Sequence, residues 1–343
     1  MTQAHKNLRI AVLGATGSVG RTILSLLDTL NVGVEEIFAL GSSQSKGKQV
    51  SFGDQDLTVL ATEEFNFKGI DWVLSATPVA TARVILPRAM KEGARVIDKS
   101  AAFRMSPSVP LVIPEVNGNL LRDYPPLIAS PNCVAIPLAL TLAPFTKVTG
   151  LERLFVSTYQ SVSGVGRRGM DELFSQTKSI LMTQAPSHGV FEKQIAFNVI
   201  PQIGSIGNDG WSDEESKIQE ETRKILSLSE DLPISVTTVR VPVLIGHSIA
   251  VTAVFHDDIS VGVARGLLKG APGVIFVDRV EGVTTPLEAT GEDVAFVSAV
   301  RQDDPRTLSF WVTCDNLRKG AALNAVQLLM MAEGMKTDKN FGE

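Results

Sequence analysis

Apolar and polar residues alternate along the first third of the chain in a pattern of short buried strands and amphipathic helices. Apolar runs typical of strands lie at 8–13, 36–40, 71–75, 95–98 and 111–113. Helical periodicity predicts helices over 21–30 and 79–91. Strands that alternate with helices favour parallel βαβ units with right-handed crossovers. We therefore expect an α/β domain with a parallel sheet over residues 1–130.

The pattern changes after residue 130. Long runs rich in β-branched residues lie at 154–162, 235–244, 249–255, 274–278, 294–300 and 308–313. Several follow one another without a helix between them, which favours a mostly antiparallel mixed sheet. Helical patterns lie at 168–182, 213–228 and 318–333. We predict a second, α+β domain over 131–317, and a C-terminal segment, 318–343, that returns to the first domain.

Composition narrows the class of protein. The 343 residues are 44% hydrophobic, with a formal net charge of -5, which gives no basic field for nucleic acid. No apolar run reaches the roughly 18 residues of a membrane span, since prolines interrupt the most apolar stretch. Two isolated cysteines without a secretory pattern favour a reducing compartment. We expect a cytoplasmic protein with no membrane or nucleic-acid partner.

A glycine-rich loop joins the first strand to the first helix: Gly14-Ala15-Thr16-Gly17-Ser18-Val19-Gly20. Its glycines permit a tight turn and close approach of a ligand, and the helix N-terminus favours a pyrophosphate. This spacing, in a βαβ context, predicts a Rossmann-type dinucleotide site. The segment after the second strand, 41–48, has no acidic residue but two lysines, which favours NADP over NAD. Solvated loop lysines are the alternative interpretation.

The sequence offers one candidate nucleophile, Cys133 in Ser130-Pro131-Asn132-Cys133. Asn132 is a suitable N-cap, which would place Cys133 at the first helical position, where the helix dipole lowers a thiol pKa. The alternative is a small buried hydrophobe. Cys314, on an apolar strand, is expected to be buried and inert.

Other candidate residues stand near strand ends or on a helix. His247 follows a strong strand and a glycine, and Arg240 on the same unit is suited to a bidentate carboxylate contact. Glu214 and Lys217 are three residues apart on a predicted helix, hence on one face. By sequence alone these two, and Arg104, are better explained as surface ion pairs. No metal-ligand set is predicted.

Several motifs together resemble the aspartate-semialdehyde dehydrogenase family over nearly the whole chain. They are Gly-Ala-Thr-Gly-Ser-Val-Gly at 14–20, Phe-Arg-Met at 103–105, Val-Ile-Pro-Glu-Val-Asn at 112–117, Pro-Asn-Cys at 131–133, Thr-Tyr-Gln-Ser-Val-Ser-Gly at 158–164, Arg-Val-Pro-Val at 240–243, Gly-His-Ser at 246–248 and Asp-Asn-Leu-Arg-Lys-Gly-Ala-Ala at 315–322. The resemblance implies a Rossmann-type domain plus a catalytic and dimerisation domain, and a homodimer.

The family's reaction is the NADPH-dependent reductive dephosphorylation of L-aspartyl-4-phosphate to L-aspartate-4-semialdehyde, a step toward lysine, diaminopimelate, threonine, methionine and isoleucine. By resemblance Cys133 forms a thioester with release of phosphate, His247 is the general acid/base and Gln160 orients the acyl group. Arg240 would bind the substrate carboxylate and Glu214 its ammonium group. The phosphate would be held by Arg104, Asn132 and Lys217.

The resemblance also assigns cofactor contacts: Thr16, Gly17, Ser18, Val19, Gln44, Ser45, Ser163, Gly164 and Asn316. Three places depart from the family pattern: Gln44, Pro78 and the segment 297–301, where Val-Ser-Ala-Val-Arg replaces a commoner Val-Gly-Arg-Ile-Arg. Gln44 stands where an arginine commonly contacts the 2′-phosphate, although Lys46 is a substitute. Pro78 has no N–H to offer the cofactor.

Two other functions fit the motifs less well. The sister enzyme N-acetyl-γ-glutamyl-phosphate reductase uses similar thioester chemistry on a substrate without a free ammonium group, and Glu214 argues against it. An inactive nucleotide-binding paralogue would not need Cys133, Gln160, Arg240 and His247 together.

Overall fold

The computed structural model describes residues 7–123, 125–278 and 280–335. These residues divide into two compact units, one formed by the chain up to Asn132 and again from Ala321, the other by Cys133–Gly320. The division predicted from the sequence lies at 130/131 and 317/318, within three residues of these boundaries. Residues 1–6 and 336–343, which that prediction includes, lie outside the described residues.

The first unit is built on a six-stranded sheet in the order β5-β2-β1-β6-β7-β8, in which every pair is parallel. Its strands are β1 (Leu8–Leu13), β2 (Val34–Gly41), β5 (Leu60–Ala61), β6 (Trp72–Ser75), β7 (Arg95–Asp98) and β8 (Leu127–Ala129). Strands β1, β6 and β7 are almost wholly buried. The expected α/β fold is confirmed.

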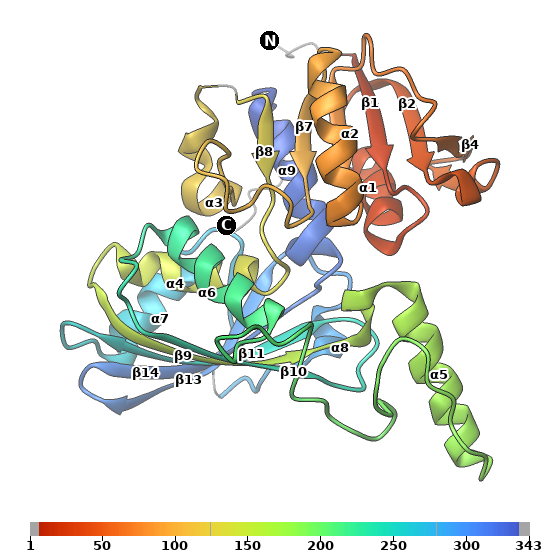
Figure 1. The fold of residues 1–343 in the computed structure, drawn as a ribbon. Coiled ribbons are helices and arrows are strands. Elements are labelled where there is room, and N and C mark those ends of the chain that lie inside the picture. The colour runs from red at the N-terminus through yellow and green to blue at the C-terminus, as the bar shows by residue number, and fades with distance from the viewer. Residues whose placement is uncertain (1–6, 124, 279, 336–343) are drawn as a thin grey trace. The chain divides into compact units, whose positions relative to one another are not determined.

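Helices cover both faces of this sheet: α1 (Ser18–Thr29), α2 (Val79–Lys91) and α9 (Leu323–Ala332). The chain moves from β1 to β2 in one direction and from β6 to β7 in the other, so right-handed crossovers place α1 and α2 on opposite faces. Helix α9 packs beside α1 (Figure 1). The reversal makes the carboxyl end of β1 a topological switch point, where α/β proteins bind ligands.

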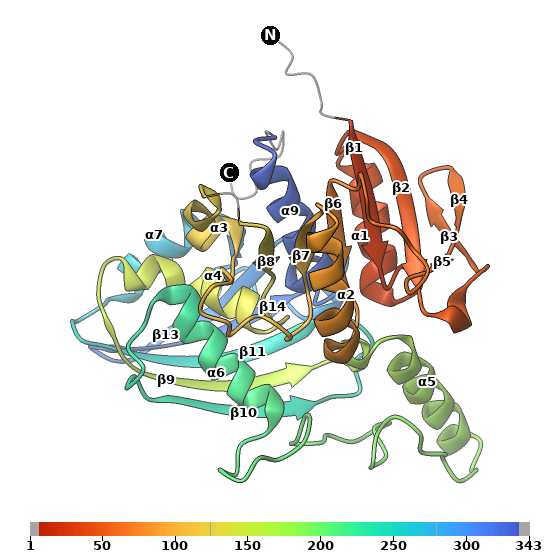
Figure 2. The same ribbon diagram turned by 45° about the horizontal axis from the view of Figure 1, so that its top comes forward.

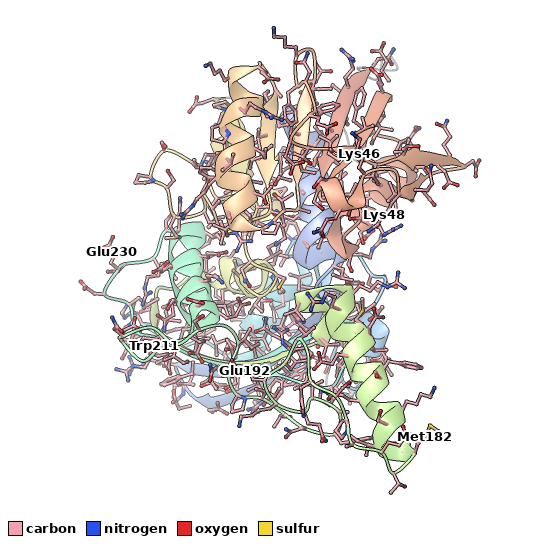
Figure 3. The ribbon with its side chains drawn as sticks, turned by 45° about the vertical axis from the view of Figure 1, so that its right-hand side comes forward. Lys46, Lys48, Met182, Glu192, Trp211 and Glu230 are labelled. Carbon is pink, nitrogen blue, oxygen red and sulfur yellow. The ribbon has the colours of Figure 1, made fainter. Side chains whose placement is uncertain are left out.

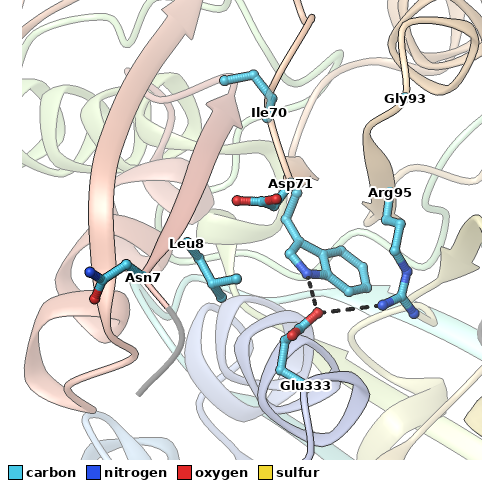
Figure 4. A pocket seen from close by; sticks show the side chains of 8 residues that line it. Asn7, Leu8, Ile70, Asp71, Gly93, Arg95 and Glu333 are labelled. Carbon is cyan, nitrogen blue, oxygen red and sulfur yellow. Dashed lines mark hydrogen bonds and ion pairs between the residues drawn. The ribbon is translucent and has the colours of Figure 1, made fainter. Parts of the chain in front are cut away.

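The end of α9 is attached to the amino edge of the same sheet. Trp72 Nε1 donates to Glu333 Oε1 at 2.9 Å, and the Arg95 guanidinium stacks on the Trp72 ring, 4.1 Å from its centroid. Arg95 Nη1 also lies 3.4 Å from Glu333 Oε1. These groups line a pocket of about 360 Å³ (Figure 4). A cation and an indole N–H therefore hold the last helix in the first unit.

Smaller elements complete this unit: η1 (Ser43–Ser45), β3 (Gln49–Phe52), β4 (Gln55–Thr58), α3 (Pro114–Asn117) and η2 (Gly118–Leu121). The hairpin β3–β4 was not predicted. The strand predicted at 111–113 is wrong, because only one bridge forms there, Leu111 with Ala129. Pro110 and Pro114 flank the run and lack the N–H groups that a longer ladder needs.

The second unit contains a six-stranded mixed sheet in the order β10-β9-β11-β14-β13-β12. The three central pairs are antiparallel and the two outer pairs parallel. Its strands are β9 (Leu151–Gln160), β10 (Ile234–Arg240), β11 (His247–Phe255), β12 (Val274–Phe276), β13 (Ala295–Asp304) and β14 (Thr307–Cys314). The mostly antiparallel mixed sheet is confirmed. Strand β10 ends four residues before the predicted limit, because Pro242 cannot continue it.

Three helices cover one face of this sheet: α4 (Ala135–Thr146), α6 (Asp213–Leu226) and α7 (Val261–Lys269) (Figure 2). Further elements are η3 (Val162–Val165), α5 (Arg167–Leu181), α8 (Pro286–Ala289) and a π-helix η4 (Arg318–Ala322). Along β9, Leu154, Val156 and Thr158 are buried, while Phe155 and Tyr159 point to the other face and are exposed. Within the described ranges, no helix is long and apolar enough to cross a membrane.

Candidate active site

The glycine loop lies at the switch point of the first unit. Gly14 has φ +76°, and a Cβ there would lie 2.5 Å from Ala76 O. At Gly20 a Cβ would lie 2.2 Å from Gly14 O, so only glycine lets α1 start this close to the loop. Gly17 is the N-cap, no side chain caps the helix, and its first turn has no acidic residue. The three predicted contacts Thr16, Ser18 and Val19 flank this cap, which suits a pyrophosphate.

The predicted adenosine contacts stand next to that loop. The N–H groups of Gly14 and Ala15 donate to Leu40 O, which joins the loop to the end of β2. Gln44 and Ser45 follow in η1, the first exposed and the second buried.

The two lysines of this region differ in how their charges are compensated. Lys46 Nζ forms an ion pair with Glu64 Oε2 at 2.6 Å, so its charge is neutralised locally. Lys48 is exposed beside it (Figure 3). Among the described contacts, Lys48 forms no ion pair with a carboxylate. Of the two lysines, it is therefore the one whose positive charge is not neutralised locally.

Two predicted phosphate contacts belong to the first unit, Arg104 after β7 and Asn132 after β8. Both are at least nine-tenths buried. Arg104 Nε donates to Ser130 O at 3.0 Å and Nη2 to Lys99 O at 2.5 Å. The guanidinium is thus fixed between two strand ends at the carboxyl edge of the sheet. It is not the surface ion pair that the sequence alone favoured.

Asp98 ends β7 beside these groups. Burial raises the pKa of its carboxyl, against the lowering effects of hydrogen bonds from Ser100 and Ser75 and of the Arg104 charge. The Ser100 N–H and hydroxyl donate to its two oxygens at 3.0 and 2.6 Å.

Cys133 opens the second unit, in a turn and not in a helix. The expectation that Asn132 caps a helix beginning at Cys133 is wrong, since α4 begins at Ala135. A helical hydrogen bond to Cys133 O would need a backbone N–H at residue 137, which is proline and has none. The first helical hydrogen bond of α4 therefore runs from Leu138 N to Val134 O at 3.2 Å. A Cβ on Gly320 would lie 3.3 Å from the Cys133 Cβ, so this glycine leaves room for the thiol-bearing residue.

Gln160 and Arg240 end the adjacent strands β9 and β10 and are partners in register. Gln160 is 1% exposed, and its amide is held at both atoms. Thr158 Oγ1 donates to Gln160 Oε1 at 3.2 Å, and Gln160 Nε2 donates to Glu214 Oε1 at 3.1 Å. The amide therefore has one orientation, with the carboxylate of Glu214 beside it.

Glu214 and Lys217 are positioned by the start of α6. Ser212 and Glu215 form a capping box, and Glu215 Oε1 accepts from Thr238 N at 3.1 Å, which attaches the helix end to β10. Lys217 Nζ lies 3.8 Å from Glu214 Oε2. The Glu214 side chain is 12% exposed, so this pair is not simply solvated.

Arg240 is 5% exposed, and its Nη1 donates to Ser161 O at 2.7 Å. Burial lowers the pKa of Arg240, while the nearby Glu214 and Cys133 charges act in the opposite direction. A pocket of about 450 Å³ beside it is lined by Arg240, Lys193, Phe191 and Gln202 among others. A planar cation next to an open pocket is suited to a carboxylate.

His247 opens β11 and is fully buried. Its Nδ1 accepts from the Ser161 backbone N–H at 3.1 Å, and the Ser161 hydroxyl lies at the same distance. In the sheet it faces Cys314, whose thiol pKa is raised well above its usual range by burial and further by Cys133. The predicted acid/base and the predicted nucleophile thus share a neighbour.

The remaining predicted cofactor contacts of this unit surround His247. Ser163 and Asn316 are 2% exposed, and Asn316 Oδ1 accepts from Ser161, Ser163 and Gly246. A Cβ on Gly164 would lie 2.7 Å from Arg240 Nη1 and 3.6 Å from the His247 Cε1.

Sequence reasoning missed Ser161, the residue that contacts both Arg240 and His247. The only signal was its place between Gln160 and Ser163 at a strand end. It also missed Lys319, which is 0% exposed in the π-helix η4. Among the described residues, no group of three or more His, Cys, Asp or Glu is arranged to hold a metal ion.

Segments of both units match models of known protein families. Residues 9–124 match the family model described as semialdehyde dehydrogenase, NAD binding domain, and residues 142–319 match semialdehyde dehydrogenase, dimerisation domain.

Similar whole proteins are also known. The aspartate-semialdehyde dehydrogenase of Rickettsia bellii is 43% identical over 329 residues, covering 94% of this chain and 97% of the relative. That of Aquifex aeolicus is 42% identical over 338 residues, covering 95% and 99%. The crystal structure of aspartate semialdehyde dehydrogenase II complexed with ASA from Vibrio cholerae has a TM-score of 0.93 and 35% identity, covering 96% of this chain and 99% of that one. The chain belongs to the aspartate-semialdehyde dehydrogenase family.

Proposed function

We propose that the chain catalyses the NADPH-dependent reductive dephosphorylation of L-aspartyl-4-phosphate to L-aspartate-4-semialdehyde through a thioester on Cys133. One observation carries the proposal: within one unit, Gln160 contacts Glu214, while Arg240 and His247 both contact Ser161. An oriented amide, a carboxylate, a buried cation and a buried imidazole are the groups that this substrate and reaction require.

The chemical steps use Cys133 and His247. The Cys133 sulfur attacks the acyl carbon, a C–S bond forms, and the C–O bond to phosphate breaks. The nicotinamide cofactor, when bound, supplies the hydride that reduces the acyl group. Cys133 is then released as the C–S bond breaks and the aldehyde forms. His247 takes the thiol proton before attack and returns a proton at collapse, as a general acid/base.

Substrate recognition follows from charge. Arg240 binds the α-carboxylate, since its guanidinium is buried and fixed by Ser161 O. Glu214 pairs with the α-ammonium group and Gln160 orients the acyl oxygen. The family resemblance adds Arg104, Asn132 and Lys217 as phosphate contacts.

The cofactor site is proposed at the glycine loop. The tight backbone packing that Gly14 and Gly20 permit, together with the uncapped start of α1, fits a dinucleotide pyrophosphate. Thr16, Gly17, Ser18 and Val19 would hold it, with Gln44 and Ser45 near the adenosine ribose, and Ser163, Gly164 and Asn316 toward the nicotinamide. NADP is proposed over NAD because no acidic residue follows β2.

The assembly is proposed to be a homodimer, formed by the face of the second sheet opposite its helices. Phe155 and Tyr159 are 43% and 38% exposed there, and Tyr159 packs on Trp311 with ring centroids 5.1 Å apart. This face also contains a pocket of about 540 Å³ lined by Phe155, Val283 and Trp311 among others. An apolar sheet face of this kind calls for a partner, and the matching family model is named a dimerisation domain.

The reaction is proposed to supply lysine, diaminopimelate, threonine, methionine and isoleucine synthesis in the cytoplasm. The proposed dehydrogenase activity is tested in the reverse direction, by following NADPH formation from aspartate semialdehyde, phosphate and NADP. Wild type is expected to be active, Cys133→Ser inactive with cofactor binding kept, and Cys314→Ala active. Equal activity of wild type and Cys133→Ser would contradict the proposal. Preference for N-acetyl-glutamate semialdehyde would favour the sister enzyme, and absence of any activity with intact cofactor binding an inactive paralogue.

A further inference from the structure

Ser161 stands between the two groups on which the proposed reaction depends. Its carbonyl accepts from Arg240 Nη1, its N–H donates to His247 Nδ1, and its hydroxyl lies 3.1 Å from the same nitrogen. Its side chain is 0% exposed. The backbone N–H, the carbonyl and the hydroxyl of Ser161 therefore all contact Arg240 or His247, and the family resemblance assigns this residue no role.

The backbone N–H of Ser161 determines the tautomer of the neutral His247 ring. An amide N–H only donates, so the nitrogen that faces it at 3.1 Å has to be an acceptor. In a neutral imidazole one nitrogen accepts and the other carries the proton. The neutral ring is therefore the Nε2–H form.

The hydroxyl of Ser161 can also stabilise the protonated, positively charged form of the His247 ring. An imidazolium carries a proton on both nitrogens, so its Nδ1–H needs an acceptor, and the backbone N–H cannot be one. Ser161 Oγ is within reach of Nδ1, and its own proton has acceptors in Asn316 Oδ1 at 3.2 Å and Ser163 Oγ at 2.9 Å. Because Asn316 Oδ1 also accepts from Gly246 N at 2.9 Å, that oxygen is fixed in place.

We propose that Ser161 is a positioning residue for proton transfer, whose hydroxyl turns to accept from His247 Nδ1–H whenever the buried ring becomes an imidazolium. In the neutral state the hydroxyl leaves Nδ1 as an acceptor. In the charged state it accepts from Nδ1 and donates to Asn316 Oδ1. This deepens the proposed function and rests on it for the role of His247 in catalysis.

Other charges also act on the ring. Arg240 lies near the His247 ring, since a Cβ placed on Gly164 would be close to both side chains. Cys314 is the cross-strand partner of His247, and it interacts electrostatically with Cys133, Asp315 and Lys319. Glu214 acts on Arg240 from α6. A buried cation at Arg240, close to the ring, disfavours an imidazolium, so an acceptor on Nδ1 matters more here than at a solvated site.

The proton balance is simple in this scheme. The proton that leaves the Cys133 thiol is gained at His247 Nδ1, the one unprotonated nitrogen of the neutral Nε2–H ring, so a thiolate and an imidazolium appear together. No proton is lost from Ser161, whose O–H only changes its acceptor. The hydroxyl therefore sets how readily the ion pair forms.

The first test is ¹⁵N NMR of histidine-labelled wild-type protein without substrate or cofactor. The His247 resonances are those missing from His247→Asn. We expect Nδ1 to be the unprotonated nitrogen of the neutral ring. A neutral ring with its proton on Nδ1 would overturn the proposal.

The second test compares Ser161→Ala with Ser163→Ala, which removes an equally buried hydroxyl bonded to Asn316 but not to His247. Ser161→Ala keeps the backbone N–H, so the tautomer should be unchanged while the His247 titration midpoint falls by about one to two pH units. Ser163→Ala should shift it much less. Equal midpoints in wild type and Ser161→Ala would overturn the proposal, and Ser161→Cys gives the same comparison if alanine prevents folding.

A third measurement separates this proposal from the proposed function. Alkylation of Cys133 by iodoacetamide near neutral pH should slow about tenfold in Ser161→Ala, because the thiolate loses its stabilised imidazolium partner. An unchanged alkylation rate would contradict the role of the hydroxyl. If the wild-type protein had no dehydrogenase activity but Ser161→Ala still changed the His247 midpoint and the alkylation rate as expected, only the proposed dehydrogenase function would fail.

Discussion

Burial separates the two cysteines chemically. Cys133 is partly exposed, while Cys314 is buried and its thiol pKa is raised well above the usual range by desolvation. Because the thiolate is the nucleophile, only the accessible cysteine should react. We predict that iodoacetamide at mildly alkaline pH modifies Cys133 alone, as read by peptide mass spectrometry. Comparable labelling of Cys314 in the folded protein would contradict its burial.

Arg240 is more than a positive charge. Its planar guanidinium donates to Ser161 O while it remains available for a carboxylate, and an ammonium cannot repeat that fork. Arg240→Lys should lower kcat/KM for aspartate semialdehyde by about 10- to 100-fold, corresponding to about 1.5–3 kcal/mol for a hydrogen bond to a charged group. Steady-state kinetics measures this, with Lys193→Arg at the same pocket as a control that keeps charge. A KM and kcat like those of wild type would rule out this role.

Asp98 should make stability fall as pH rises. Burial raises the pKa of Asp98 above its ordinary 3.8, so the folded state binds a proton that the unfolded chain has already released in the window above pH 3.8. The stabilisation is fully present below that pH and is lost as pH rises through the folded pKa. As pH rises across this window, we expect the free energy of unfolding of Asp98→Asn to increase relative to that of wild type. Urea unfolding at several pH values measures this difference. A difference that does not change with pH would refute it.

At the scale of elements, glycine decides where a helix can begin. A Cβ at Gly20 would lie 2.2 Å from the Gly14 carbonyl oxygen, whereas at Gly266 in α7 nothing lies within 4 Å. Gly20→Ala should destabilise by more than about 2 kcal/mol because backbone has to move, while Gly266→Ala should stabilise by about 0.5–1 kcal/mol through helix propensity. Urea denaturation measures both. Equal effects of the two substitutions would show that the loop adapts without strain.

Much of the element order was predictable, and the errors have local causes. The predicted limits of α2 and β7 are those observed, since a buried stripe and a short apolar run bounded by polar residues leave little choice. The helix start at Cys133 was wrong because Pro137 removes the N–H that it needed. The hairpin β3–β4 was missed because its two short strands are mostly polar, and helix α7 was missed because it is short and contains two glycines.

At the scale of the whole molecule, the second sheet has one face that α4, α6 and α7 leave uncovered. We predict that the protein is a dimer and that Phe155→Asp makes it a monomer, since a charge would be buried at the centre of this apolar face. Light scattering after size exclusion gives the mass. Val84→Asp is the matched control, because Val84 is 71% exposed on α2. If the Phe155→Asp variant still formed dimers of unchanged affinity, this face would be excluded as the interface.

The sequence by itself predicted most of the strands and helices of the two large sheets, the glycine loop and the candidate reactive side chains. Period, proline and glycine act over a few residues, so they can be interpreted without coordinates. Only the tertiary structure decided which of these groups meet. Gln160, Glu214, Arg240 and His247 come from four elements up to 87 residues apart in the chain (from 160 to 247), and strand register and burial bring them together. The same long-range packing revealed Ser161, whose role depends on neighbours that no local pattern specifies.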